Sequence, residues 1–305
     1  EEWIESVLKK INLKAKDIQK VVEIDYLIGQ KMSYAPEEQT ECEDEEATRA
    51  LWKSIVSGYG VCVAMAKIEN YMFRRIGLKS KVVESSNHAF VKLEDIEIPI
   101  EEEQKVIVKR GNTIVDLTWN LSDYAIGTLP NMLVKSYQEI RREDIVKGKD
   151  TMSHKNDQEL ADATLSLELS ILRSIYESSK VVDLEKMNKG KKLFLDSIEI
   201  WNLKESPEIK TKKVLQLVQN FESEISRHQQ EISRGLTIFL HGIDFRRSVV
   251  DRVYDKSDKE KKPVLYVYMD FPQEGKKFFY LDGGKNLFIE MSQKEFEEKF
   301  ESYEY

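Results

Sequence analysis

Hydrophobic residues recur every three to four positions along the N-terminal part of the chain, which is the spacing of amphipathic helices. The pattern predicts four helices, at 3–11, at 18–27, from about 47 onward, and at 61–76. Gly77 is placed to end the last of them, because glycine readily adopts the left-handed conformation that closes many helices. Residues 36–46 are strongly acidic and are interpreted as a loop. The chain therefore begins with helices.

After Gly77 the pattern changes to that of strands. Four strands are predicted, at 81–85, 89–93, 105–109 and 113–118. The last two form an expected hairpin whose turn is 110–112, with the sequence Arg-Gly-Asn. The segment 94–104 contains a proline and an acidic triplet and is interpreted as an exposed excursion. Helices followed by strands predict an α+β unit that ends near residue 150.

The second half of the chain has the same order of helices and then strands. Helices are expected at 165–176 and 212–234, strands at 236–240, 248–254, 264–269, 278–281 and 287–290, and a short closing helix around Phe296 and Phe300. The segment 282–284, Asp-Gly-Gly, supplies a turn between the last two strands. Two domains are therefore predicted, 1–150 and 151–305, the second combining helices with an antiparallel sheet.

Composition narrows the possible functions. The 305 residues include 47 Lys and Arg against 55 Asp and Glu, and both signs are mixed along the chain, so no nucleic-acid partner is expected. No apolar run approaches the roughly 18–20 residues of a transmembrane helix. With two cysteines, neither a disulfide scaffold nor a four-cysteine zinc site is expected. His154, His228 and His241 lack metal-ligand spacing, and no metal is expected.

Cys62 is the first candidate for chemistry. It follows the segment 58–61, Gly-Tyr-Gly-Val, and stands at the predicted start of a helix. Unpaired N–H groups and the helix dipole favour an anion there, either a thiolate or the oxyanion of a tetrahedral intermediate. The alternative is that Cys62 is a small buried apolar residue, as most free cysteines are. Cys42 lies among acids, which disfavour a thiolate, and is a poor nucleophile.

His88 and Asp116 are candidate partners of the Cys62 thiol. His88 stands at the entry to a predicted strand, and a strand beside the helix can place the ring over the thiol. Asp116 is an acid inside the otherwise apolar predicted strand 113–118, where a buried carboxylate needs a partner such as an imidazole N–H. Each residue also has an alternative explanation. His88 can be a structural histidine, and Asp116 can be an acid on the solvent face of an edge strand.

Together these segments resemble the transglutaminase-like superfamily, which has a papain-like Cys-His-Asp arrangement. The resemblance covers about 45–125 and is carried by Gly60-Val61-Cys62, Gly77-Leu78, His88-Ala89-Phe90 and Asp116-Leu117-Thr118-Trp119. Phe90 stands where the family usually has tryptophan, and Asn87 where glycine is common. The interval between His88 and Asp116 is longer than the family norm, and the excursion at 94–104 accounts for the added length.

The resemblance implies a transglutaminase-like catalytic domain at 1–150, and it does not cover the second half of the chain. The α+β domain at 151–305 is interpreted as an accessory domain that presents a partner or substrate. Cys62 would attack the carbonyl of an amide in a protein or peptide, His88 would carry protons, and Asp116 would orient the imidazole. The acyl group then passes to water or to an amine. This chemistry implies no cofactor.

Tyr59 and Trp119 are candidate walls of the substrate channel, with ordinary core aromatics as the alternative. Two other classes of function stay open: a catalytically silent binding module of the same fold, and an assembly protein with a vestigial triad. The lack of a visible signal favours a cytoplasmic setting as the default. Because the first residue is Glu1, a removed upstream signal or anchor is also open.

Overall fold

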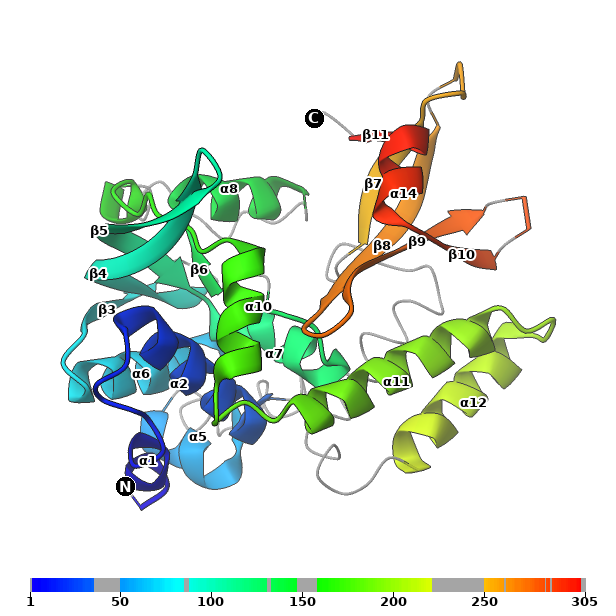
Figure 1. The fold of residues 1–305 in the computed structure, drawn as a ribbon. Helices are drawn as coiled ribbons and strands as arrows, with labels where there is room; N and C mark the ends of the chain where they lie inside the picture. The colour runs from blue at the N-terminus through cyan, green and yellow to red at the C-terminus, as the bar shows by residue number, and fades with distance from the viewer. Residues whose placement is uncertain are drawn as a thin grey trace. The chain divides into compact units, whose positions relative to one another are not determined.

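The computed structural model of the chain describes residues 2–35, 50–84, 88–130, 133–146, 158–220, 250–260, 262–282, 284–285 and 287–302. Contacts divide the chain into two compact units: unit 1 comprises Glu1–Tyr124 and Pro130–Leu184, and unit 2 comprises Ala125–Leu129 and Glu185–Tyr305. Each unit combines helices with an antiparallel sheet (Figure 1), which confirms the predicted α+β class. The predicted loop at 36–46 lies outside the described residues.

Unit 1 begins with the four helices that the hydrophobic pattern predicts. They are α1 (Glu2–Leu8), α2 (Asp17–Lys31), α5 (Leu51–Ser57) and α6 (Cys62–Arg75). The buried stripe of α6 holds its apolar side chains against α2 and against the sheet that follows. Gly77 has a φ of 87° after the last turn of α6, as its place in the sequence predicts. The N–H of Leu78 then donates to the carbonyl of Phe73, which closes the helix end.

The sheet of unit 1 places the candidate residues at one end of its strands. Its strands, in spatial order, are β3 (Lys79–Glu84), β4 (Ala89–Glu102), β5 (Lys105–Val115) and β6 (Leu133–Lys135), and all neighbours are antiparallel. Helix α6 covers one face of β3 and β4. The short parallel pair β1 (Ser33–Tyr34) and β2 (Tyr59–Gly60) leads the chain into α6.

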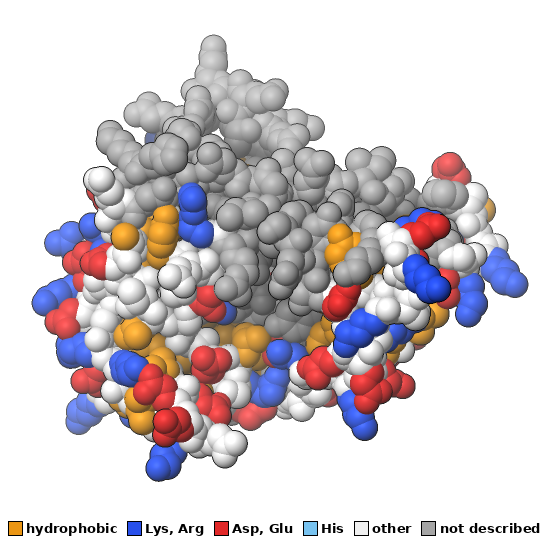
Figure 2. Space-filling model, turned by 90° about the horizontal axis from the view of Figure 1, so that it is seen from above, with side chains coloured by type: hydrophobic (Ala, Val, Ile, Leu, Met, Phe, Trp, Pro, Cys, Tyr) orange, Lys and Arg blue, Asp and Glu red, His pale blue; other side chains and the backbone are white. Residues whose placement is uncertain are grey.

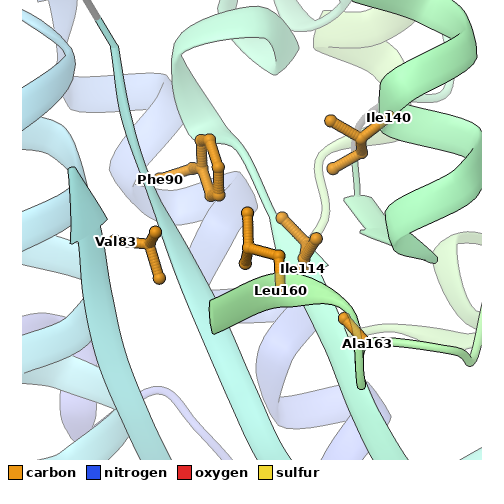
Figure 3. Packing of buried hydrophobic residues seen from close by; sticks show 6 residues of the cluster. All are labelled: Val83, Phe90, Ile114, Ile140, Leu160 and Ala163. Atoms are coloured by element: carbon orange, nitrogen blue, oxygen red, sulfur yellow. The ribbon is translucent and has the colours of Figure 1, made fainter. Parts of the chain in front are cut away.

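The other face of this sheet is covered by later segments of the chain. These are α8 (Tyr137–Val146) and the segment before α10 (Leu169–Ser178). Helix α7 (Leu117–Ile126) and α10 instead reach α2, where Tyr124 and Tyr176 pack against Tyr26. Figure 3 shows the hydrophobic cluster that joins the strands to α8 and to the segment before α10; its members are Val83, Phe90, Ile114, Ile140, Leu160 and Ala163. The N–H of Tyr137 also donates to the carbonyl of Ala163 over 2.6 Å. Unit 1 therefore continues to Leu184 rather than ending near 150, because residues 158–163 complete its core.

Two sequence expectations about the β4–β5 hairpin are wrong. The segment 94–104 is not an excursion: most of it continues β4, with Ile96 and Ile98 buried between exposed acids. The turn lies at Glu103 and Gln104, which have φ values of 51° and 63°, the backbone of a primed hairpin turn. Gly111 lies inside β5 instead, and a Cβ atom there would come within 2.9 Å of the Leu165 side chain. Glycine is therefore needed at position 111 because the Leu165 side chain lies close to it, and not because the chain turns there.

The described residues of unit 2 form two helices and then a five-stranded antiparallel sheet, with a short third helix before its last strand. Its elements are α11 (Leu184–Trp201), α12 (Pro207–Asn220), β7 (Val250–Asp255), β8 (Pro263–Phe271), β9 (Gly275–Asp282), β10 (Leu287–Met291), α14 (Gln293–Lys299) and β11 (Phe300–Ser302). The spatial order is β10-β9-β8-β7-β11. The predicted closing helix is present as α14, although Phe300, which was expected in it, begins β11. The Phe296 ring of α14 stacks on Phe278 of β9 with centroids 4.7 Å apart, so this helix packs on the sheet.

The last four predicted strands correspond to β7 to β10, and the predicted helices correspond to α10 and α12. Residues 221–240, which hold the rest of one predicted helix and a predicted strand, lie outside the described residues. Helix α11 and strand β11 were not predicted. None of the helices in the described ranges is both long and apolar enough to span a membrane. On the face drawn in Figure 2, basic and acidic side chains are interspersed.

Candidate active site

The backbone before α6 is arranged to bring Cys62 to the first position of that helix. Gly58 ends α5 with a φ of 80°, and the chain then pairs with β1 through β2. A Cβ atom on Gly60 would lie 3.1 Å from the Cβ of Ala64 and 3.2 Å from the hydroxyl of Ser54. Glycine at this position therefore lets the entering strand pass close to the first turn of α6.

Cys62 is a buried thiol, 8% exposed, at the start of α6. The residue at the N-cap is Val61, whose side chain has no oxygen to accept from the first-turn N–H groups. Those N–H groups lie at the positive end of the helix dipole. The predicted position of Cys62 at a helix start is confirmed. The site consequently offers donors for an anion at or next to the sulfur.

His88 lies immediately before β4, as predicted, and connects the other two residues of the candidate Cys-His-Asp triad. Its Nε2 is 2.6 Å from Oδ2 of Asp116. The ring also interacts electrostatically with the Cys62 side chain, and because Nε2 is bonded to Asp116, Nδ1 is the nitrogen left for the thiol. The structure thus brings together Cys62, His88 and Asp116, which are far apart in the sequence.

The charge state of His88 is set by two opposing effects. Burial lowers the pKa of the ring, since only 9% of the side chain is exposed. The negative charge and hydrogen bond of Asp116, followed by the contact with Cys62, more than offset burial and raise the pKa of His88 from the usual 6.5 to about 10. His88 is therefore an imidazolium at neutral pH, held between a carboxylate and a sulfur.

Asp116 is not inside a strand, in contrast to the sequence expectation. Strand β5 ends at Val115 and α7 begins at Leu117, so the carboxylate stands at the junction. The side chain is 2% exposed. Its Oδ1 has no hydrogen-bond partner among the described residues. The junction explains how an acid in an apolar segment can be buried: it turns the chain from the sheet into a helix whose N-terminus favours the negative charge.

Of the two predicted wall residues, one lies beside the triad. The Trp119 ring is edge-on to His88 at 6.2 Å between centroids, and it also packs against the hydrophobic cluster that contains Phe90. Phe90 itself lies 5.7 Å from the His88 ring, so a second aromatic side chain lies beside the imidazole. Tyr59 is half-buried in β2, and both its N–H and its carbonyl bond to the hydroxyl of Ser57. Its role as a wall stays a prediction.

No family model, curated protein or solved structure matches this chain. Cys42 and the three other histidines lie outside the described residues. Within the described ranges, no group of three or more His, Cys, Asp or Glu side chains is arranged to hold a metal ion.

The sequence analysis missed a set of polar residues behind the triad. Asp25 and Glu69 are fully buried, and Asn120 and Tyr124 extend from α7 toward them. A signal for Glu69 existed in the sequence: it follows Cys62 by seven positions, which places an acid on the apolar stripe of a helix. Asp25 is likewise an acid between two buried hydrophobic residues of α2. Such acids are uncommon without a partner or a role.

Proposed function

We propose that this chain is a transglutaminase-like enzyme that transfers an acyl group from a protein or peptide amide through a cysteine nucleophile. The observation that supports the proposal is the continuous contact from Cys62 through His88 to Asp116, with the thiol at a helix start. Along the chain, a cysteine at a helix start comes first, a histidine at a strand start second and a buried aspartate third. The family motifs have the same order. The transglutaminase-like core is part of this proposal.

In the first step the Cys62 sulfur attacks the carbonyl carbon of the substrate amide. A thiol beside an imidazolium is favoured as the thiolate, which is the nucleophilic form. The carbonyl oxygen becomes an oxyanion, and the first-turn N–H groups of α6 are positioned to donate to it. His88 then gives its Nδ1 proton to the leaving nitrogen, the C–N bond breaks, and ammonia or an amine departs from a thioester.

In the second step the thioester is resolved. His88, now neutral, accepts a proton from water or from a primary amine as that molecule attacks the thioester carbonyl. The C–S bond breaks, and the sulfur leaves as a thiolate beside the restored imidazolium. Water yields a carboxylate, which is deamidation or proteolysis, and an amine yields a new amide. Both routes use the same three side chains.

Asp116 orients the ring that moves these protons. Its carboxylate accepts a hydrogen bond from the Nε2–H of His88, so Nδ1 faces the sulfur in both steps. Because the carboxylate is buried, its interaction with the imidazolium is less screened than a surface pair would be. The proposed role of Asp116 is therefore to fix the tautomer and to stabilise the cation.

The test is to incubate the full chain with a glutamine-containing protein and a labelled primary amine, and to measure ammonia, incorporated amine and cut backbone separately. We expect at least one of these products, its loss in Cys62→Ala, and its retention in Cys42→Ala. A folded chain that forms none of them and whose Cys62 is no more reactive than an ordinary thiol would contradict the proposal. That outcome would favour the silent binding module.

A further inference from the structure

Three carboxyl groups meet in the interior of unit 1. Asp25 comes from α2, Glu69 from α6 and Asp116 from the start of α7, and their side chains are 0%, 0% and 2% exposed. Asp116 acts electrostatically on both of the others, so the three share one buried environment. The proposed catalysis uses Asp116 alone. The other two carboxyls therefore need a separate explanation.

Asp25 is held by donors from α7. The Asn120 amide donates to its Oδ2 over 3.2 Å, and the hydroxyl of Tyr124 donates to the same oxygen. The hydroxyl of Tyr176 in turn donates to Tyr124 over 3.0 Å. Gly29, one turn after Asp25, makes this possible, because a Cβ atom there would lie 2.4 Å from the Tyr124 ring. The neighbours of Asp25 are thus arranged to stabilise an anion.

Glu69 is in a different situation. Its carboxyl approaches Asp25 and the N–H of Leu117, the residue that follows Asp116, but neither contact is a well-aligned hydrogen bond. Both of its oxygens, and Oδ1 of Asp116, have no hydrogen-bond partner among the described residues. Buried oxygens without a donor are costly. One proton on Glu69 would supply the donor that this group of oxygens lacks.

Burial and the neighbouring charges also favour a proton on Glu69 and a negative charge on Asp25. Burial, then the negative charge of Asp25, raises the pKa of Glu69 well above its usual value. Burial also raises the pKa of Asp25 to about 6, although contacts with Glu69, Tyr124 and Asn120 oppose the rise. Carboxylates this close in a low-dielectric interior do not all ionise together.

We infer that Asp25 and Glu69 form a positioning pair behind the triad, in which Glu69 is a neutral acid at neutral pH and Asp25 an anion. The pair keeps the shared proton off Asp116, so that Asp116 remains the charged acceptor of His88. The negative charge of Asp25 then adds to that of Asp116 in stabilising the imidazolium. This inference rests on the proposed function only in giving His88 a catalytic purpose.

The ionisable groups that face the pair come from every element around it. Helix α6 contributes Glu69 with Cys62 at its start, the start of α7 contributes Asp116 and its third turn Tyr124, and α10 contributes Tyr176. Asp123 and Tyr26 act on the hydroxyl of Tyr176 rather than on the pair. The cation that balances these carboxyls is His88, through Asp116.

The first experiment follows the His88 ring by nitrogen NMR across a pH titration of the full chain. We expect Asp25→Asn to lower the pKa of His88 by about one pH unit, because the variant loses the attraction between the Asp25 carboxylate and the buried imidazolium. Glu69→Gln should leave it nearly unchanged, because it replaces a neutral group by a neutral group. Glu23→Gln is the matched control: Glu23 is a buried acid of α2 that bonds to Gln19 and Ser179 instead of the triad.

The second experiment detects the proton directly by infrared spectroscopy. We expect the parent chain to show a protonated carboxyl band at neutral pH that Glu69→Gln removes and Glu23→Gln retains. If the parent lacks this band, or if Glu69→Gln lowers the pKa of His88 as much as Asp25→Asn does, the inference is wrong. The parent spectrum decides the matter even if Asp25→Asn fails to fold. An inert Cys62 together with the expected band would reject the proposed function and keep the inference.

Discussion

Two buried cations at the start of β4 show how a structural ion pair differs from one proposed to be functional. Lys92 and His88 are 3% and 9% exposed and lie four residues apart. Lys92 pairs with Asp162, which is 60% exposed, and also donates to the carbonyl of Glu159 over 3.0 Å. His88 pairs with Asp116, which is itself buried and has two more buried carboxyls behind it.

The difference lies in what surrounds the negative partner. Asp162 keeps much of its contact with water, and the pair joins the segment 158–163 to the sheet. Around Asp116 there is more buried negative charge than one histidine needs, and several oxygens lack donors. An arrangement of this kind costs stability and is typical of functional sites, where shifted pKa values are put to use. The predictions below test whether the two pairs differ in this way.

The largest effect is expected from His88→Ala. Without the imidazolium, an ordinary thiol is almost entirely protonated at pH 6, so alkylation of Cys62 at that pH should fall by about 100-fold. Turnover should be lost as well. Alkylation followed by mass spectrometry measures the first effect. Unchanged labelling in the folded variant would show that His88 does not activate the thiol.

Asp116→Asn should separate orientation from charge. The ring and its proton remain, but the amide favours the wrong tautomer, so turnover should fall by about 10²–10⁴-fold while part of the low-pH alkylation survives. Amine incorporation and alkylation, measured on the same preparation, give the two numbers. Parent-like turnover in folded Asp116→Asn would remove Asp116 from the triad.

The stability of the protein should depend on pH because of His88. Its pKa is raised from 6.5 to about 10, so the folded state holds a proton that the unfolded state has lost across that window. The contribution of His88 to the free energy of unfolding is full below pH 6.5 and falls as the pH rises toward 10. Its slope is at most about 1.4 kcal/mol per pH unit. Urea unfolding at several pH values measures it. His88→Ala should flatten the slope, and an equal slope in that variant would contradict the assignment.

Lys92→Met should have the smallest effect, and on stability alone. The change removes the buried charge, keeps the aliphatic stem, and returns Asp162 to water, so we expect a loss of about 1–2 kcal/mol in the free energy of unfolding. Alkylation of Cys62 should match the parent. If Lys92→Met lowered thiol reactivity as His88→Ala does, the distinction between the two pairs would fail.

Local periodicity predicted the elements that position Cys62 and His88. The apolar stripe of α6 and the apolar start of β4 are properties of consecutive residues, so Cys62 and His88 were placed correctly. Asp116 was placed in a strand because its neighbours are apolar, and it stands instead between the end of β5 and the start of α7. Within β4, the proline and the acids led to the prediction of a loop, although isoleucines recur at every second position there, as in a strand.

The carboxyl pair could not be assembled from the sequence. Asp25, Glu69 and Tyr124 lie on three helices and meet only through tertiary packing, which periodicity does not specify. The sequence does mark each acid as an exception on an apolar face. That mark shows where a partner is required, but it does not say which partner.

The most direct test of the account is brief alkylation of the full chain near pH 6, with Cys62 and Cys42 quantified separately by mass spectrometry. The account predicts stoichiometric labelling of Cys62, which contacts an imidazolium at a helix start, and little labelling of Cys42, which has acidic sequence neighbours. Equal labelling of the two cysteines, or a Cys62 that reacts only at alkaline pH, would contradict the claim that this site activates a thiol.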